Sequence, residues 1–218
     1  WKKADGLETP SGKIEFVSKR ITELDPDSIE RPPLAKWLAH SEQVGSKKSK
    51  KYPLSVMTNH PKYRFHVQGD DIVWIRELGK IRGKDNYFYE PCWIHPDDAG
   101  GRGIKQGDII MAYNDRGAIL FGAVITERII PGALSIDHGA KIDFALLDNH
   151  KVDRGGCINL IAPTVQEKYE KGTEIEIPEM NISGFLVELE KIDTTKIEPG
   201  VAVNFDELVQ KEMPGGVA

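Results

Sequence analysis

Short runs of apolar and β-branched residues, separated by turn residues, dominate the chain from position 52 to position 192. The runs that we interpret as strands are YPLSVM (52–57), YRFHVQ (63–68), CWIH (92–95), DIIMAYN (108–114), AILFGAVIT (118–126), ALSID (133–137), CINLIA (157–162), EIEI (174–177) and FLVELEKI (185–192). Pro-Asp, Gly-Gly, Asn-Asp-Arg-Gly and Pro-Gly between them are typical of tight turns. Many short strands with few helices predict a β-barrel or sandwich and not a doubly wound sheet.

Helix signals are few. In HPDDAGGRGI (95–104), Pro96 suits the first helical position, Asp97 and Asp98 suit the first turn, and a glycine ends the helix. We expect two further short helices, in LAKWLAH (34–40) and in TVQEKYEKG (164–172).

The two ends of the chain differ from its centre in their pattern of apolar and polar residues. Ile14 and Phe16 alternate with polar neighbours, which predicts a half-buried strand near the N-terminus. Positions 25–51 are rich in Pro, Lys and Ser and indicate an exposed connection. We therefore divide the chain into an N-terminal strand and connection (1–51), a β-domain (52–192) and a tail (193–218) whose role the sequence leaves open.

Composition narrows the class of protein. The chain has 218 residues, 39% hydrophobic and 29% charged, which allows a substantial core and excludes wholesale disorder. No run approaches the roughly 20 apolar residues of a membrane span. A formal charge of −5 argues against a general nucleic-acid binder. The chain opens at Trp1 without a signal segment, so we expect a piece of a longer polypeptide.

Cysteine usage excludes two kinds of metal centre. Cys92 and Cys157 are the only cysteines and form no CxxC pair, so this chain alone cannot build a cysteine-rich zinc or iron–sulfur site. We expect two reduced thiols and no disulfide.

The stretch TNHPKYRFHVQGDD (58–71) carries the strongest candidate chemistry. If it continues as a strand, Arg64, His66 and Gln68 share one face, and the apolar side chains between them enter the core. A cation, an imidazole and an amide suit phosphate or the polar edge of a heteroaromatic ring. Thr58 and His60 precede them in a turn. The alternative is a solvated polar face without a ligand.

Three glycine-containing stretches have mainly structural interpretations. GGRGIKQGD (100–108) has glycines spaced GxGxxxG after a helix, which does not fit a dinucleotide fingerprint but suits a helix stop and a tight turn. YNDRGAILFGAVIT (113–126) predicts a hairpin, within which Gly122 marks a bulge or a close backbone approach. Gly155 and Gly156 would let main-chain amides approach a ligand.

Other candidates are weaker. Asn159 lies between apolar residues on a predicted strand, where its amide would bind a polar ring or cap the backbone. Asp137, His138 and Asp143 lack any established metal-ligand spacing. No GxSxG sequence is present, so a hydrolytic triad has no support.

Six motifs occur in a familiar order. They are TPSGKIEF (9–16), LSVMTNHPKYRFHVQ (54–68), IHPDDAGGRGIKQGDIIMAYNDRG (94–117), ITERIIPGALSIDHGA (125–140), GGCINLIAPT (155–164) and GFLVELEKI (184–192). In this order they resemble the C-terminal molybdopterin-dinucleotide-binding domain of the dimethyl-sulfoxide-reductase family, and within it the transhydroxylases. The resemblance implies a six-stranded double-psi β-barrel with a few short helices.

The resemblance also implies a cofactor and the residues that hold it. Members bind molybdenum or tungsten through two molybdopterin guanine dinucleotides, and this domain clamps their pterin and phosphate parts without being catalytic alone. The matching positions are Thr58, His60, Arg64, His66, Gln68 and Asn159. Relatives place a basic residue before the last strand, whereas Ser183-Gly184 stands here. The protein ligand of the metal and any iron–sulfur cysteines would lie in other domains, and we expect the isolated chain to lack the cofactor.

Partners follow from the same resemblance. We expect the remaining domains of the same polypeptide and an iron–sulfur subunit as partners, no nucleic acid, and a cytoplasmic location, with the periplasm as the alternative. Two other functions stay open: a double-psi barrel that recognises proteins, as in ATP-driven unfoldases, and a small enzyme that uses His60, His66 and aspartates.

Overall fold

The structure, a computed structural model, describes residues 6–27, 32–36, 42–167, 177–180 and 183–200. The chain divides into two compact units, Trp1–His40 and Ser41–Ala218.

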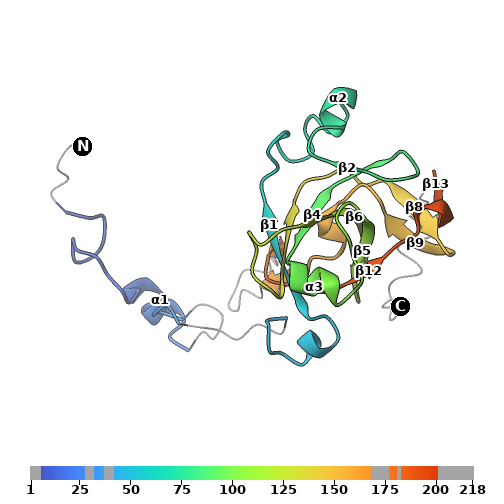
Figure 1. The fold of residues 1–218 in the computed structure, drawn as a ribbon. Helices are drawn as coiled ribbons and strands as arrows, with labels where there is room; N and C mark the ends of the chain where they lie inside the picture. The colour runs from blue at the N-terminus through green and yellow to red at the C-terminus, as the bar shows by residue number, and fades with distance from the viewer. Residues whose placement is uncertain (1–5, 28–31, 37–41, 168–176, 181–182, 201–218) are drawn as a thin grey trace, which may run out of the picture. The chain divides into compact units, whose positions relative to one another are not determined.

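The larger unit is a β-barrel with short helices at its margins (Figure 1). Its strands are β1 (Leu54–Asn59), β2 (Ile81–Arg82), β3 (Phe88–Tyr89), β4 (Pro91–Ile94), β5 (Ile109–Asn114), β6 (Gly117–Ile125), β7 (Ala133–Asp137), β8 (Phe144–Leu147), β9 (His150–Asp153), β10 (Thr164–Glu167), β11 (Ile177–Met180), β12 (Leu186–Lys191) and β13 (Ile197–Pro199). Its helices are α2 (Val73–Arg76) and α3 (Pro96–Gly100), with 3-10 turns η1 (Lys48–Lys50), η2 (Ile158–Leu160) and η3 (Thr194–Lys196).

Six strands close the barrel in the order β6-β4-β7-β1-β12-β5, and a pairing between β5 and β6 completes the ring. Two neighbouring pairs are parallel, β1 with β7 and β4 with β6, while the other pairs of the ring are antiparallel. Strands β9, β8 and β13 extend the sheet from β6. The predicted six-stranded double-psi barrel is confirmed.

Strand β6 is apolar on both faces because both faces are covered in the fold. Ile119 and Phe121 pack inside the barrel, whereas Leu120 packs in a second cluster on the outer side of β6, with residues of β3, β8 and β9. A strand covered on both faces reads as a continuous apolar run. At Gly122 an added Cβ atom would clash with the Ile81 side chain of β2, so the glycine does allow a close approach, but of a side chain and not of the backbone that was predicted.

Helix α3 forms as predicted and begins with Pro96. Nδ1 of His95 accepts a hydrogen bond from the Asp97 N–H at 3.2 Å and caps the first turn. The hairpin of β5 and β6 is also confirmed, with pairing from Ile109–Gly122 to Asn114–Gly117.

Several predicted elements are wrong. No strand forms at Ile14 and Phe16, which are 73% and 81% exposed; helix α1 (Lys19–Leu24) follows instead, capped by Ser18. Positions 157–162 form η2 and not a strand, and 164–167 form β10, paired with β11, and not a helix. The predicted helix at 34–40 and strand at 174–177 lie largely outside the described residues.

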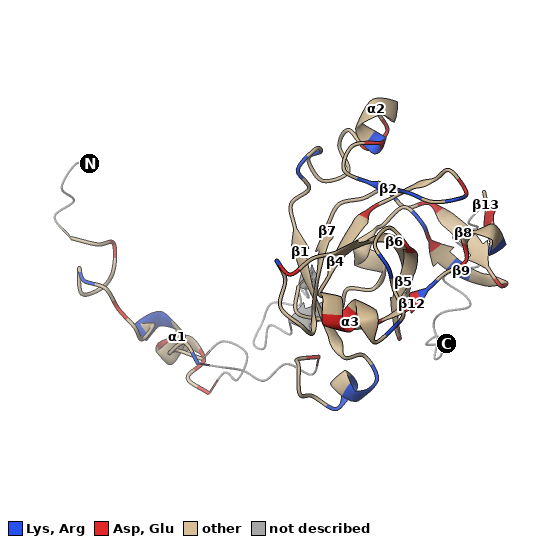
Figure 2. Ribbon diagram, in the orientation of Figure 1, with Lys and Arg blue, Asp and Glu red and all other residues tan. Residues whose placement is uncertain are grey.

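Charged residues of both signs are interspersed along the ribbon of the barrel unit (Figure 2), in keeping with the small formal charge of the chain. Among the described residues, no helix is long and apolar enough to cross a membrane.

Candidate functional site

The candidate site begins where β1 and β7 end together. These strands are parallel and in register to their last residues, with Asn59 opposite Asp137. The N–H of His138 donates to the carbonyl oxygen of Asn59 at 3.0 Å. His60 and His138 therefore leave the barrel at the same edge, and their ring centroids lie 4.4 Å apart.

The segment after β1 is a turn and not a strand. Gln68 N–H bonds back to the Phe65 carbonyl at 2.9 Å, and His66 adopts a positive φ of 51°. The predicted two-residue alternation is wrong here for this reason. The side chains assigned to the core are exposed: Tyr63 by 47%, Phe65 by 66% and Val67 by 50%.

Arg64 points inward, with only 5% of its side chain exposed. Its guanidinium nitrogens donate to the carboxylate of Glu90 at 3.2 Å, to the His138 carbonyl at 3.1 Å and to the Gly139 carbonyl at 3.4 Å. The guanidinium nitrogens, which the sequence analysis assigned to a ligand, therefore bind acceptors of the protein itself. Arg64 thereby links the turn to the residues just after β7 and just before β4.

Glu90 and Arg64 belong to a buried network of four charges. Lys80 lies 2.9 Å from both Asp70 and Glu90, and all three side chains are at most 5% exposed. Burial acts to raise the pKa of Asp70, but the Lys80 bond and the Lys141 N–H outweigh it and lower that pKa. The opposite signs balance, which is what makes burial of four charges tolerable.

A cavity of about 310 Å³ adjoins this network. Arg64, Asp70, Lys80 and Glu90 line it together with Asp137. Burial, and then the charge of Glu90, raise the pKa of the Asp137 carboxyl, whereas Arg64 opposes the shift. The pocket therefore combines fixed charges with one carboxyl that accepts a proton more readily than usual.

Three imidazoles gather beside this network. The ring centroid of His66 lies 5.2 Å from that of His60 and 4.9 Å from that of His138. His138 is 7% exposed, and neither ring nitrogen has a hydrogen-bond partner among the described residues. Burial and the neighbouring imidazoles lower the pKa of His138. Gly139 allows this packing, because a Cβ there would lie 2.6 Å from Cα of His66.

The remaining predicted residues lie at different places. The N–H of Thr58 donates to Oγ of Ser183 at 3.1 Å, and the two hydroxyls are 3.2 Å apart, so the serine before β12 contacts this site residue. Gln68 is exposed in the turn. Asn159 is exposed on η2 and is not among the residues that line the cavity beside Arg64.

The glycine pair after β9 has a structural role. Asp153 is fully buried, and its carboxylate accepts four main-chain N–H bonds: from Asp143 at 2.8 Å, Gly155 at 2.9 Å, Gly156 at 3.0 Å and Cys157 at 2.7 Å. The amides of Gly155 and Gly156 are thus used within the protein and do not point at a ligand.

Sequence reasoning missed Glu90, Lys80 and Asp70 and gave His138 only a weak metal role. Lys80 and Glu90 flank the two-residue strands β2 and β3, which are too short to leave a periodic signal. Of these residues only Glu90 directly follows an apolar run, Tyr87-Phe88-Tyr89, and this position was the one available signal.

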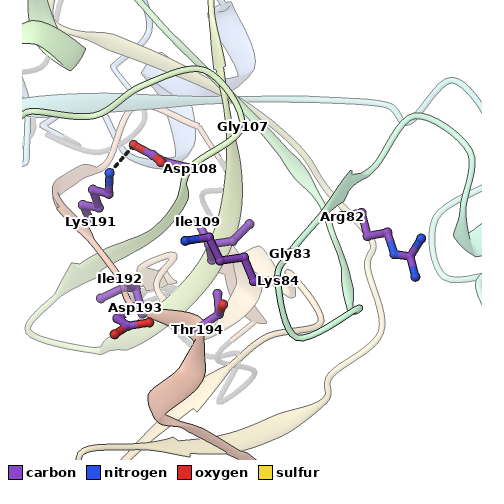
Figure 3. A pocket seen from close by; sticks show the side chains of 10 residues that line it. All are labelled: Arg82, Gly83, Lys84, Gly107, Asp108, Ile109, Lys191, Ile192, Asp193 and Thr194. Atoms are coloured by element: carbon purple, nitrogen blue, oxygen red, sulfur yellow. Dashed lines mark ion pairs between the residues drawn. The ribbon is translucent and has the colours of Figure 1, made fainter.

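A second cavity, of about 430 Å³, shares no residue with the three histidines (Figure 3). It lies between the β2–β3 turn, with Arg82 and Lys84, and the end of β12, where Lys191 pairs with Asp108 at 2.8 Å.

Both cysteines are free, and burial raises the pKa of each thiol.

Comparison with known proteins assigns the fold and its cofactor. The family model described as "Molydopterin dinucleotide binding domain" matches residues 54–177. The chain belongs to this family. The matched segment contains the three histidines, the four-charge network and Asn159.

Curated relatives extend the match. The chain is 37% identical over 157 residues to dimethyl sulfoxide/trimethylamine N-oxide reductase of Cereibacter sphaeroides, covering 72% of this chain and 18% of the relative. It is 34% identical over 201 residues to the pyrogallol hydroxytransferase large subunit of Pelobacter acidigallici, covering 88% and 22%. The chain thus spans about a fifth of these relatives.

A solved structure shows the same fold. Acetylene hydratase from Pelobacter acetylenicus superposes with a TM-score of 0.59 over 87% of this chain and 25% of that protein, at 17% identity. The predicted membership of the dimethyl-sulfoxide-reductase family, among reductases and a transhydroxylase, is confirmed. It implies two molybdopterin guanine dinucleotides with molybdenum in the complete enzyme, and it disfavours both the protein-recognition barrel and the stand-alone small enzyme.

Proposed function

We propose that this molybdopterin-dinucleotide-binding domain clamps the pterin and phosphate parts of the cofactor of a larger oxidoreductase or transhydroxylase and is not catalytic alone. The observation that carries the proposal is the group of His60, His66 and His138 at the common end of β1 and β7. In its centre lies a buried imidazole whose nitrogens lack partners within the described chain.

The residues fit such a ligand. A dinucleotide brings a pyrophosphate and two ring systems with hydrogen-bonding edges. The exposed imidazoles of His60 and His66 donate to phosphate oxygens, and the amides of Gln68 and Asn159 both donate and accept, as ring edges require. Thr58 supplies a hydroxyl already held by Ser183.

Arg64 contributes differently from the sequence-based expectation. Because its guanidinium is bound to Glu90 and to two carbonyl oxygens, it positions the His66 turn against β7. We propose that its cationic charge favours the phosphates through this position and that the contact atoms come from the histidines. When bound, the molybdenum or tungsten centre supplies the redox chemistry; this domain orients the cofactor and excludes water.

The rest of the polypeptide is the proposed partner of an exposed apolar surface. Val73 and Trp74 of α2 are 75% and 67% exposed, and Phe65 in the neighbouring turn is 66% exposed. Helix α2 projects from the barrel in Figure 1. Large exposed apolar side chains are typical of interfaces, and these relatives are about four times as long as this chain, since the matched 72% and 88% of this chain make up 18% and 22% of the relatives.

Two further proposals concern the complete enzyme. An iron–sulfur subunit is a proposed second partner, supported by the name of the pyrogallol hydroxytransferase relative, which is a large subunit. A cytoplasmic location is supported by the two free thiols. Co-purification of the enzyme and cell fractionation test these two proposals directly.

The clamp is tested in the complete enzyme. His60→Ala and His66→Ala each remove one proposed phosphate contact, and Asn159→Ala removes one ring contact. Each charge-assisted contact contributes about 1.5–3 kcal/mol, so cofactor binding should weaken about 10- to 100-fold. The measurements are metal content by mass spectrometry and guanine nucleotide released by acid.

His150→Ala is the matched control, because His150 is an exposed histidine on β9, outside the cluster. It should retain full metal and nucleotide content. Full content in the His60, His66 and Asn159 variants as well would contradict the clamp.

A further inference from the structure

The three histidines also have the geometry of a metal site that does not depend on the cofactor. One ligand nitrogen from each of His60, His66 and His138 can be chosen so that all three lie within 4.8 Å of one another. Nitrogens bonded to one tetrahedral zinc ion lie about 3.4 Å apart. A modest turn of the side chains closes this difference.

One of the three imidazole rings is buried, and the other two are exposed at the surface. His138 is buried at 7% exposure and fixed at the end of β7. His66 stacks on it at an interplanar angle of 26°, so their lone pairs do not yet meet at one point. His60 and His66 are exposed and can rotate toward the buried ring.

The backbone holds the three residues together before any ion arrives. His138 N–H is bound to the Asn59 carbonyl, one residue before His60. His66 keeps an uncommon positive φ of 51° at the place where Gly139 leaves room for its Cα. A preorganised site loses less conformational entropy on binding.

The donor chemistry selects the class of ion. Both nitrogens of the buried His138 ring lack a hydrogen-bond partner among the described residues, which is costly unless a ligand completes the ring. Neutral imidazole is the metal-binding form. Imidazole ligands suit zinc, copper, nickel and cobalt, whereas magnesium and calcium prefer oxygen.

We propose that His60, His66 and His138 bind one divalent transition-metal ion of the zinc class, leaving the fourth position to water or an anion. The site goes beyond the clamp function and shares His60 and His66 with it. Metal and dinucleotide would therefore compete, and the metal site belongs to the chain without its cofactor. Its test needs no cofactor, so its failure and that of the clamp are distinguishable.

The test uses the tag-free 218-residue chain after treatment with a chelator. Titration calorimetry with Zn²⁺ should show one ion per chain with a Kd on the order of 1 μM or tighter. Co²⁺ should give the intense visible absorption of a four-coordinate site and should be displaced by Zn²⁺.

Variants assign the ligands. His138→Ala, His60→Ala and His66→Ala should each weaken Zn²⁺ binding at least about tenfold. His150→Ala should not change it. His60 and His66 are exposed, so their variants remain informative where His138→Ala fails to fold.

Three results would overturn the site. These are the lack of saturable binding, affinity unchanged in both the His60 and His66 variants, and an equal loss in the His150 control.

Discussion

The guanidinium of Arg64 lies 3.2 Å from both carboxylate oxygens of Glu90, and both side chains are at most 5% exposed. Twenty-six positions separate the two residues in the chain. The pair joins the turn after β1 to the start of β4, while Lys80 joins Glu90 to Asp70. Through Arg64, which donates to the carbonyl oxygens of His138 and Gly139, this charged network contacts the backbone at the histidine cluster.

Removing Arg64 should destabilise the fold. In Arg64→Met the charge of Glu90 loses one of its two cations inside the protein, which should lower the free energy of unfolding by about 3 kcal/mol. Chemical denaturation measures the change. Arg128→Ala, at an exposed arginine, should stay within about 0.5 kcal/mol of the native chain. Equal stability of both variants would show that the pair is not a structural support.

The sequence predicts the barrel well because its long strands carry clear patterns. Strands β5, β6 and β12 coincide with apolar runs between turn residues. The strands that the sequence misses are β2, β3, β8, β9, β10 and β13, of two to four residues. Such pieces are stabilised by tertiary packing, which local periodicity does not report.

The candidate site is predictable in its residue types and not in its geometry. The sequence singles out the polar stretch after β1, and the structure brings its His60 and His66 together with His138, but His66 has a left-handed backbone that breaks any two-residue alternation. The inward course of Arg64 depends on Glu90, whose partner role no local pattern reveals. His138 joins the site through the parallel pairing of β1 and β7, a relation between distant segments.

Gly139 should be required for the histidine arrangement. Gly139→Ala places a Cβ 2.6 Å from Cα of His66 at a φ of 79°, so strain and a backbone clash combine. Gly132 is a matched control, because its φ is 82° and no atom lies within 4 Å of its added Cβ. Strain alone predicts a cost of about 1–2 kcal/mol for Gly132→Ala. Gly139→Ala should cost clearly more and should shift the imidazole resonances of His66 and His138 in NMR spectra. Equal costs would mean that the close approach is relieved easily.

Low pH should weaken the hydrogen bonds and ion pairs that Glu42 forms with Arg116 and Lys48. Hydrogen bonds from Arg116, at 2.7 and 2.8 Å, and then from Lys48, at 2.7 Å, outweigh burial and lower the pKa of Glu42 from 4.5 to about 2. Because the folded pKa is depressed, the stabilisation is complete above pH 4.5 and is lost as the pH falls toward 2.

Glu42→Gln should therefore be less stable than the native chain by on the order of 2 kcal/mol at pH 7. The difference should shrink between pH 4.5 and 2. Unfolding curves across this range measure it, and a difference that does not depend on pH would contradict the assignment.

Asp153 should be the residue that shapes the loop after β9. Asp153→Asn keeps the size but turns an amide NH₂ toward main-chain donors, so at least one of four N–H groups loses its acceptor. A buried unsatisfied donor costs about 1–3 kcal/mol, measured by thermal or chemical denaturation. Asp148→Asn changes an exposed aspartate and should have little effect. Amide exchange at positions 155–157 should rise in the first variant and not in the second.

The apolar surface on α2 should be covered in the complete polypeptide. Val73 and Trp74 are exposed in this chain, so Trp74→Ser should change its unfolding free energy by less than about 0.5 kcal/mol. In the complete enzyme the same substitution removes buried apolar area and should loosen the domain by about 2 kcal/mol. Hydrogen exchange at positions 72–78 measures this directly. Exchange should be slow in the native enzyme and fast in this chain. In the enzyme variant it should be faster than in the native enzyme. Lys84→Ser, in the turn after β2, serves as the polar control. Fast exchange at 72–78 in the native enzyme would exclude this surface as the domain contact.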